Sequence, residues 1–253
     1  IGDQIFNVKV GMDNSGKGLR KISQSQYGTK NCNILNCTDR LANADINGFF
    51  QYDMKIYSTY KEDLLKDFSF KGHYLKRANH IASVLEAQKG VTVGLHLRRG
   101  DYGTGIFYIA PNQWYVEWLE KLKERYNSLT IFIASDDLKA VEKDFANYNV
   151  ITANEFGKDT SIPEFFDDFA ALTLCNKLAI SNSTFSFTAG LFNTQADEFL
   201  RPNLQSKSLV SFDPWTSEPL QRTEIAEKHG EEFMNKQAKS RSNYKIKKLF
   251  GLN

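Results

Sequence analysis

The sequence predicts an α/β protein organised around a parallel β-sheet. From residue 91 onward, short apolar runs alternate with amphipathic segments of helical length, a pattern typical of consecutive β/α units. The chain has 253 residues, which is enough for one large α/β domain or for two lobes of unequal size. Hydrophobic residues make up 41% and charged residues 25% of the chain, as in ordinary folded globular proteins, which excludes a disordered chain.

The first part of the chain, residues 1–90, carries weaker patterns and predicts a reduced amino-terminal lobe. Residues 5–10 favour a short strand within sequence that is otherwise rich in Gly, Ser, Asn and Lys. Apolar residues fall on one helical face over residues 62–70 and again over residues 74–88, which predicts two helices. Lys89-Gly90 ends the second of them.

The strands of the predicted sheet lie within residues 91–220, which we interpret as a Rossmann-like lobe. The first of them is a continuous apolar run, as expected for a parallel strand that is buried on both faces. The predicted strands are residues 91–97, 129–134, 150–152, 178–181 and 209–212.

Amphipathic segments between these strands predict the helices of the same lobe. Pro111 and Pro163 suit the first positions of two helices, and acidic residues follow Pro163 in the first turn. The predicted helices are residues 111–126, 137–145, 163–175 and 183–192.

The charge balance limits the kinds of partner that the chain can bind. Lys and Arg number 32 and Asp and Glu number 30, which gives a formal charge of +2 and argues against a nucleic-acid partner. Residues 221–253 predict a basic helical tail, whose lysine-rich part at 236–248 favours a solvated surface over a nucleic-acid arm. No apolar run reaches the roughly 20 residues of a spanning helix, so we expect no membrane span in this chain.

The three cysteines do not indicate a metal site. They form neither a CxxC pair nor a zinc-like quartet, and their odd number excludes a complete disulfide framework. Cys175 lies in an apolar run and is expected to be a small buried hydrophobe. A disulfide between Cys32 and Cys37 is the less favoured interpretation, because nothing marks the compartment as oxidising.

Polar residues follow three of the predicted strands. Arg98-Arg99-Gly100-Asp101 follows the first strand, Ser135-Asp136-Asp137 follows the second, and the segment 182–186 follows the fourth. Because the carboxyl ends of parallel strands meet at one edge of a sheet, we expect these three loops to share a crevice.

This set of residues suits a sugar nucleotide diphosphate. Arginine holds phosphate oxygens bidentately and can stabilise the charge on a departing pyrophosphate. Free N–H groups at a helix start, with the Ser183, Thr184 and Ser186 hydroxyls, add phosphate donors. A carboxylate of Asp136 or Asp137 can accept from the N–H edge of a guanine base. Such a site requires neither a metal nor a cofactor.

Each loop also has a purely structural interpretation. The Arg98 loop alone reads as a salt-bridged surface turn, and Asp136 and Asp137 are good helix caps. Ser183 and Thr184 are caps as well, and His96, inside an apolar strand, is typical of a hydrogen-bonded core residue. The ordered combination of the three loops favours the functional interpretation.

Segments of the chain match, in order, the motifs of a known family. His96-Leu97-Arg98-Arg99-Gly100-Asp101-Tyr102 resembles the His-x-Arg-Arg-Gly-Asp-Tyr motif of the α1,2-fucosyltransferase family, to which α1,6- and protein O-fucosyltransferases are more distantly related. Further segments that resemble family motifs are Gly48-Phe49-Phe50-Gln51, residues 131–137, residues 168–175 and residues 180–186.

The resemblance implies a fold and a reaction. It implies a GT-B-like fold with a Rossmann-like carboxyl-terminal lobe that binds the donor GDP-fucose. It also implies an inverting, metal-independent transfer of L-fucose to a glycan acceptor, commonly the 2-hydroxyl of a terminal galactoside.

Roles follow for the matching positions. Arg98 would contact the β-phosphate, and His96 with Asp137 would help to fix guanine. Arg99 and Asp101 would brace the loop, and Asp101 is also the candidate proton acceptor, so the predicted catalytic residues are Arg98 and Asp101. The predicted donor-binding residues are His96, Arg98, Arg99, Asp136, Asp137, Ser183, Thr184, Phe185 and Ser186.

Some segments depart from the family pattern. The family's amino-terminal glycine-rich motif survives only as residues 1–6, and residues 186–191 differ beside the predicted diphosphate site. The acceptor site is therefore left unassigned. The alternatives are a transferase with another donor sugar or acceptor, and an inactive nucleotide- or glycan-binding module. Because the chain starts at Ile1, we expect a truncated or processed product, either cytoplasmic and microbial or viral, or a Golgi-lumenal catalytic domain without its anchor.

Overall fold

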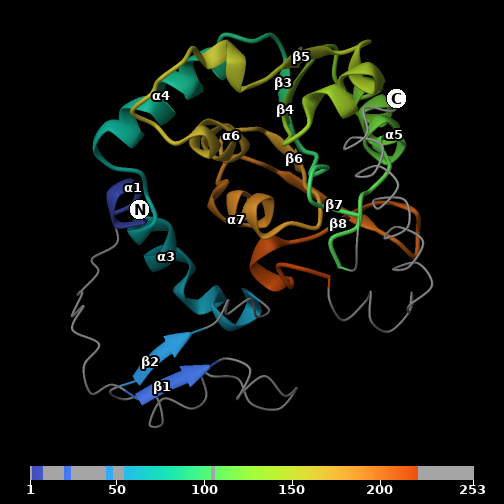
Figure 1. Ribbon diagram of the computed structural model, residues 1–253. Coiled ribbons are helices and arrows are strands. Elements are labelled where there is room, and N and C mark those ends of the chain that lie inside the picture. Colours follow the sequence, from blue (N-terminus) through green and yellow to red (C-terminus); the bar gives the residue numbers. More distant parts are fainter. Residues whose placement is uncertain (1, 8–19, 24–43, 48–53, 104–105, 222–253) are drawn as a thin grey trace, which may run out of the picture.

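A six-stranded, mostly parallel sheet forms the centre of the protein (Figure 1). The computed structural model describes residues 2–7, 20–23, 44–47, 54–103 and 106–221. The strand order is β5-β4-β3-β6-β7-β8, and only β8 runs antiparallel to its neighbour. The strands are β3 (Val91–His96), β4 (Leu129–Ala134), β5 (Asn149–Ile151), β6 (Lys177–Ala179), β7 (Glu198–Asn203) and β8 (Ser208–Ser211).

The direction in which strands are added changes at β3. The chain first adds β4 and β5 on one side of β3, and then returns to add β6 and β7 on the other side. In this register His96 lies beside Ala134 of β4, and Leu95 lies beside Ala179 of β6. The loops that follow β4, β3 and β6 are therefore neighbours at one edge of the sheet, which is the position where open α/β sheets bind ligands.

Helices cover both faces of the sheet (Figure 1). Helix α5 (Asn112–Lys123) packs on one face, against a core that includes Leu95 and Ile133. Helices α6 (Glu164–Leu172) and α7 (Thr184–Phe192) pack on the other face, against Phe132 and Leu178. Parallel strands that are buried on both faces account for the continuous apolar runs in the sequence.

Gly94 in β3 allows Cys175 and Leu178 to pack closely against the strand. A Cβ atom at Gly94 would lie 3.0 Å from the Cys175 sulfur and 3.0 Å from Cδ1 of Leu178. Cys175 is fully buried, which confirms its prediction as a small apolar residue.

The amino-terminal segments pack on the same side of the sheet as α6. Helix α4 (Gly72–Glu86) packs on α6, and Ile5 and Phe6 extend the same core. Before α4 come α1 (Gly2–Ile5), the parallel pair β1 (Arg20–Ser23) and β2 (Ala44–Asn47), the 3-10 turns η3 (Met54–Ile56) and η4 (Ser58–Tyr60), and α3 (Lys61–Asp67).

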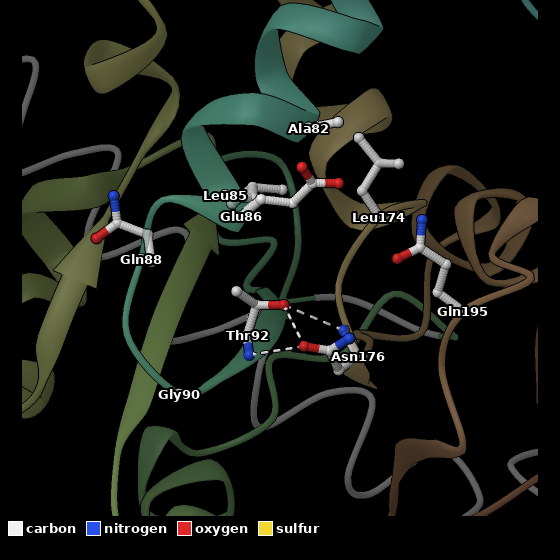
Figure 2. Close-up of a pocket in the computed structure, with 9 residues that line it drawn as sticks. All are labelled: Ala82, Leu85, Glu86, Gln88, Gly90, Thr92, Leu174, Asn176 and Gln195. Carbon is white, nitrogen blue, oxygen red and sulfur yellow. Dashed lines mark hydrogen bonds between the residues drawn. The ribbon is translucent and has the colours of Figure 1, made fainter.

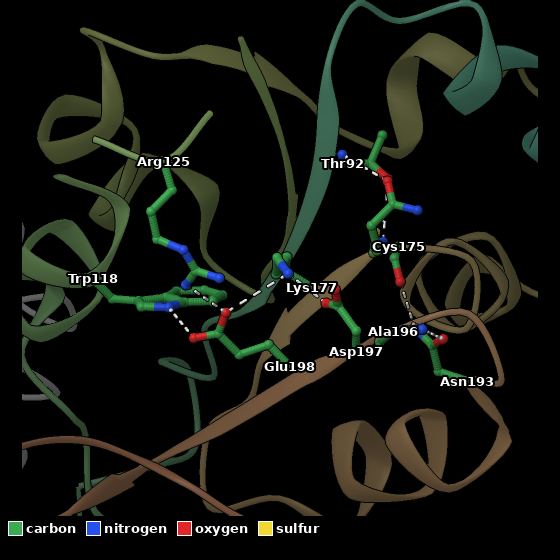
Figure 3. Close-up of polar contacts among 10 residues, drawn as sticks. Thr92, Trp118, Arg125, Cys175, Lys177, Asn193, Ala196, Asp197 and Glu198 are labelled. Carbon is green, nitrogen blue, oxygen red and sulfur yellow. Dashed lines mark hydrogen bonds and ion pairs between the residues drawn. The ribbon is translucent and has the colours of Figure 1, made fainter. Parts of the chain in front are cut away.

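A buried lysine fixes the amino end of β6 (Figure 3). Only 3% of the Lys177 side chain is exposed, and its ammonium group pairs with Asp197 and, at 3.8 Å, with Glu198. Glu198 also accepts from Nε1 of Trp118 at 3.1 Å and from Arg125 at 3.4 Å. This network links α5 to the start of β7 at the edge of the sheet opposite to the predicted site.

Several sequence predictions are wrong in detail. Residues 137–145 form two 3-10 turns, η5 (Leu138–Ala140) and η6 (Glu142–Phe145), because buried Val141 between them has non-helical dihedrals of −120° and −28°. Ile5 belongs to a helix rather than a strand, and β7 was not predicted.

Other predictions lie outside the described residues: the strand at 8–10, Cys32 and Cys37, the Gly48–Gln51 motif and the tail at 222–253. The division of the chain into lobes stays a prediction. Among the described helices, none is long and apolar enough to cross a membrane.

Candidate active site

The loop after β3 is tied to the end of β4. The Ser135 hydroxyl donates to the carbonyl of Leu97 at 2.7 Å, and Leu97 N–H donates to the carbonyl of Ala134 at 2.9 Å. These bonds continue the β3–β4 pairing by one residue beyond the strands. The arginine pair therefore leaves the sheet from a fixed point.

Asp136 shapes the Arg98-Arg99-Gly100 loop. Its carboxylate accepts from the N–H of Arg99 at 2.7 Å and from the N–H of Gly100 at 2.8 Å, and it lies 3.3 Å from Nε of Arg98. A Cβ atom at Gly100 would lie 2.6 Å from Oδ2 of Asp136. The predicted donor-binding carboxylate thus holds the loop from within the protein.

Arg98 presents the outer end of its guanidinium. Nε donates to Oδ1 of Asp101 at 2.8 Å, and 36% of the Arg98 side chain is exposed. The bond to Asp101 raises the pKa of Arg98, which therefore remains charged. Among the described residues, none accepts a hydrogen bond from Nη1 or Nη2 of Arg98, so both nitrogens can serve a ligand.

Arg99 points the other way and makes the contacts of a brace. Its Nη1 donates to the Arg98 carbonyl at 2.9 Å, and its Nη2 donates to Oδ1 of Asn112. Asn112 donates in turn to Asp144 at 2.6 Å. Burial lowers the pKa of Arg99, and the chain of bonds anchors the loop to the start of α5.

His96 is a neutral, buried imidazole at the end of β3. Burial, with the nearby charges of Arg98 and Arg99, lowers the pKa of His96 to about 3. Nδ1 is 2.7 Å from the Ser181 hydroxyl, and the ring centre is 5.3 Å from that of Phe185. No described residue hydrogen-bonds to Nε2, so this nitrogen can pair with a ligand.

The loop after β6 is joined to the Arg98 loop through Tyr102. The Tyr102 hydroxyl donates to the Asn182 carbonyl at 3.1 Å and contacts the Ser183 side chain. Asn182 is buried, and its amide donates to the carbonyl of Ile106 at 2.6 Å. The structure thus brings together the loops after β3, β4 and β6.

Helix α7 begins beside these three loops. Ser183 is its N-cap residue, but the Ser183 side chain accepts no hydrogen bond from the first turn. Thr184 and Phe185 are partly exposed, whereas Ser186 is fully buried, with its hydroxyl 3.4 Å from the Ser183 carbonyl. First-turn N–H groups have no partner within a helix, so this end can receive an anion.

Asp137 makes a structural contact. Its carboxylate caps η5 by accepting from the N–H of Ala140 at 3.3 Å, as the structural interpretation of this residue expects. That contact leaves capacity for a base, because a carboxylate has several acceptor positions.

Asp168 on α6 is a candidate that the sequence reasoning did not select. Burial, with the charge of Asp167, raises the pKa of Asp168 to about 7, and no described residue hydrogen-bonds to it. The next residue, Phe169, packs on Phe185, which contacts His96. Strongly shifted carboxyl groups gather at functional sites, and an acid among apolar residues on a helix was the available signal.

A small pocket lies at the opposite end of β3 (Figure 2). Its volume is about 100 Å³, and Gly90, Thr92 and Asn176 are among its lining residues. Oδ1 of Asn176 accepts from both the N–H and the hydroxyl of Thr92, at 3.0 and 2.8 Å. The pocket therefore lies away from the Arg98 loop, which follows the other end of β3.

Two curated relatives from Escherichia coli resemble the chain. The O-antigen biosynthesis glycosyltransferase WbnK is 24% identical over 195 residues, which cover 72% of this chain and 63% of WbnK. The alpha-1,2-colitosyltransferase is 27% identical over 181 residues, which cover 66% of this chain and 58% of that protein. The chain thus spans less than two thirds of the length of either relative.

Solved structures of POFUT1 resemble the fold at a lower level. POFUT1 in complex with GDP has a TM-score of 0.39 at 14% identity, over 56% of this chain and 48% of that chain. POFUT1 in complex with GDP-fucose has a TM-score of 0.38 at 15% identity, over 56% and 47%. In sequence, residues 24–208 match glycosyl transferase family 11, so the chain belongs to this family, the α1,2-fucosyltransferase family.

Proposed function

We propose that the chain transfers L-fucose from GDP-fucose to a glycan hydroxyl, with the 2-hydroxyl of a terminal galactoside as the expected acceptor. One observation carries the proposal: Arg98, whose Nη atoms bond to no acceptor in the part of the chain that the structure describes, and the start of α7, which has no side-chain cap, belong to loops that Tyr102 joins directly. Two anion-binding groups that converge from adjacent strands suit a diphosphate.

The reaction is a single displacement. The acceptor oxygen attacks the anomeric carbon of fucose from the face opposite to the diphosphate, and the bond from that carbon to the β-phosphate oxygen breaks. Arg98 and the first turn of α7 stabilise the negative charge that develops on GDP. This chemistry is inverting and needs neither a metal nor a cofactor.

The proton of the acceptor hydroxyl passes to a carboxylate or to solvent. Asp101 is the candidate base, because 62% of its side chain is exposed beside Arg98. Its bond to Nε of Arg98 equally suits a brace for that side chain. His96 and a carboxylate, either Asp137 or Asp168, are the candidates to pair with guanine.

Substitution of Arg98 tests the proposal. We expect Arg98→Ala to abolish fucosyl transfer and to weaken GDP binding about 10- to 100-fold, because a bidentate charged contact is lost. Arg98→Lys should recover only part of the affinity, since it keeps the charge without the paired donors. Arg125→Ala, an exposed arginine at the opposite edge of the sheet, is the control. Full turnover in Arg98→Ala would refute the mechanism.

A second candidate is the transfer of another deoxyhexose. It is favoured by the 27% identity to a protein named alpha-1,2-colitosyltransferase. A thermal-shift panel of GDP-fucose, GDP-colitose, GDP-mannose and UDP-galactose, followed by transfer assays, separates the two donors. Stabilisation by GDP-colitose well beyond that by GDP-fucose would replace our proposal with this candidate.

A further inference from the structure

We propose that Tyr102 is a positioning residue that holds Arg98 and the start of α7 at the separation that a diphosphate requires. The inference rests on the proposed function. It concerns a residue that takes part in no chemical step of the proposed displacement.

The hydroxyl end of Tyr102 is fixed to a rigid segment. It is buried and donates to the carbonyl of Asn182, 80 residues away in the sequence, at 3.1 Å. Asn182 is itself held on two sides, because its amide donates to the Ile106 carbonyl and its Oδ1 accepts from the N–H of Gln221 at 3.1 Å. Movement of this anchor would break several buried hydrogen bonds.

The ring end of Tyr102 supports Arg98. The centre of the Arg98 guanidinium lies 5.8 Å from the ring centre, within the range of a cation–π contact. Phe107 packs on the same ring, with the two centres 5.2 Å apart. The hydrogen bond to Asp101 and the approach of Asp136 at 3.3 Å both involve Nε of Arg98, and the ring adds a contact that limits where the rest of the guanidinium can lie.

The strands alone do not set this separation. The last pair between β3 and β6 is Leu95 with Ala179, and Arg98 and Ser183 lie beyond it in loops. Tyr102 makes the direct contact between these two loops. Misplacement of a catalytic group by about 1 Å can lower a rate about 100-fold, so a small change in this contact affects transfer more than stability.

Removal of one hydroxyl tests the inference, and the chain offers a matched control. Tyr102→Phe loses the bond to Asn182 but keeps the ring. Tyr115→Phe loses a similar bond, from a buried tyrosine hydroxyl to the Ile180 carbonyl at 3.1 Å. We expect similar decreases in melting temperature for both variants, but a decrease of about tenfold in kcat and in GDP affinity for Tyr102→Phe alone.

A double-mutant cycle shows whether Tyr102 acts through Arg98. We expect Tyr102→Phe to have little further effect on GDP affinity in an Arg98→Ala background, because the positioned group is then absent. Additive losses, or equal kcat and GDP affinity in Tyr102→Phe and wild type, would overturn the inference. Wild-type protein that binds no GDP would overturn the proposed function as well, which distinguishes the two failures.

Discussion

Gly100 is required because its α-carbon faces the carboxylate that shapes the loop. The 2.6 Å approach of a Cβ atom to Asp136 is too short for van der Waals contact, so Gly100→Ala must displace either the loop or the carboxylate. We expect nucleotide affinity to fall at least about tenfold while the protein stays folded, as measured by calorimetric titration with GDP. Gly190→Ala is the control, since its nearest neighbour lies at 3.5 Å, and equal affinities for the two variants would contradict this account.

We expect function and stability to oppose each other at Asp168. Its pKa in the folded protein, about 7, lies above the ordinary value of 3.8, so the folded state binds a proton that the unfolded state has released between these pH values. Stability is therefore lost as the pH rises through this range. We expect Asp168→Asn to raise the free energy of unfolding at pH 8 by up to about 4 kcal/mol, at about 1.4 kcal/mol per pKa unit, with little difference at pH 3.5.

Urea denaturation at the two pH values measures this effect. If Asp168 also binds the nucleotide, the stabilised variant will bind GDP more weakly than wild type. A variant that is no more stable at pH 8 would show that the carboxyl group is solvated or paired.

The sequence identified the arginine pair and the hydroxyl-rich helix start, because these types of residue have few other uses at strand ends. It did not separate Asp136, which shapes the loop, from Asp137, which caps a turn, since adjacent carboxylates at a strand end look alike. Nor did it select Asp168, whose shifted pKa depends on the packing of α6 against the sheet. The burial of this carboxyl group depends on tertiary contacts, which the sequence pattern does not reveal.

Helix α4 is fixed to α6 by a buried arginine. Nε and Nη2 of Arg77 donate to the two oxygens of Asp167 at 2.8 and 2.5 Å, and its guanidinium also donates to the carbonyls of Phe156 and Gly157. We expect Arg77→Ala to lower the free energy of unfolding by about 3 kcal/mol, because it leaves a partly buried carboxylate and two carbonyls without their donor.

The same measurement on Lys123→Ala provides the comparison. Lys123 pairs with Glu120 on the surface of α5, with side chains 43% and 56% exposed. Such pairs contribute about 0 to 1 kcal/mol. A cost for Arg77→Ala no larger than that for Lys123→Ala would mean that α4 does not depend on this contact.

Elements with continuous apolar runs or clear amphipathic faces were predicted from the sequence, and interrupted elements were not. Strand β7 contains Arg201 and Pro202, which argue against a strand. The structure tolerates Pro202 because β6 pairs only with residues 198–200 of β7, so the missing N–H lies beyond that ladder. The sequence pattern does not give the strand order, so it does not show which residues of β7 must pair with a neighbouring strand.

His96, which is buried, and Asp168, which is partly buried, have opposite effects on the stability of the whole protein. The pKa of His96 is lowered to about 3, so between about pH 3 and 6.5 the unfolded state binds a proton that the folded state does not. This contribution rises with pH, whereas that of Asp168 falls over nearly the same range. The two should largely cancel between pH 4 and 6.5.

Removal of one group should expose the other. We expect the free energy of unfolding of Asp168→Asn to decrease as the pH falls from 6.5 to 4, by up to about 1.4 kcal/mol per pH unit. A further His96→Gln substitution should flatten that profile. Identical profiles for wild type and Asp168→Asn would show that the two groups are not coupled to folding in this way.

The change of direction at β3 has a consequence for how the protein can diversify. Because β3 and β6 are hydrogen-bonded neighbours, the loops that carry Arg98 and the start of α7 lie side by side without any direct pairing to the outer strand β5. The exposed residues 158–161, between buried Phe156 and Ile162, can therefore be exchanged for a longer or shorter segment without moving Arg98 relative to α7. Changes in this segment would then alter the substrate preference at the edge of the sheet, while the residues that perform the transfer at its centre stay the same.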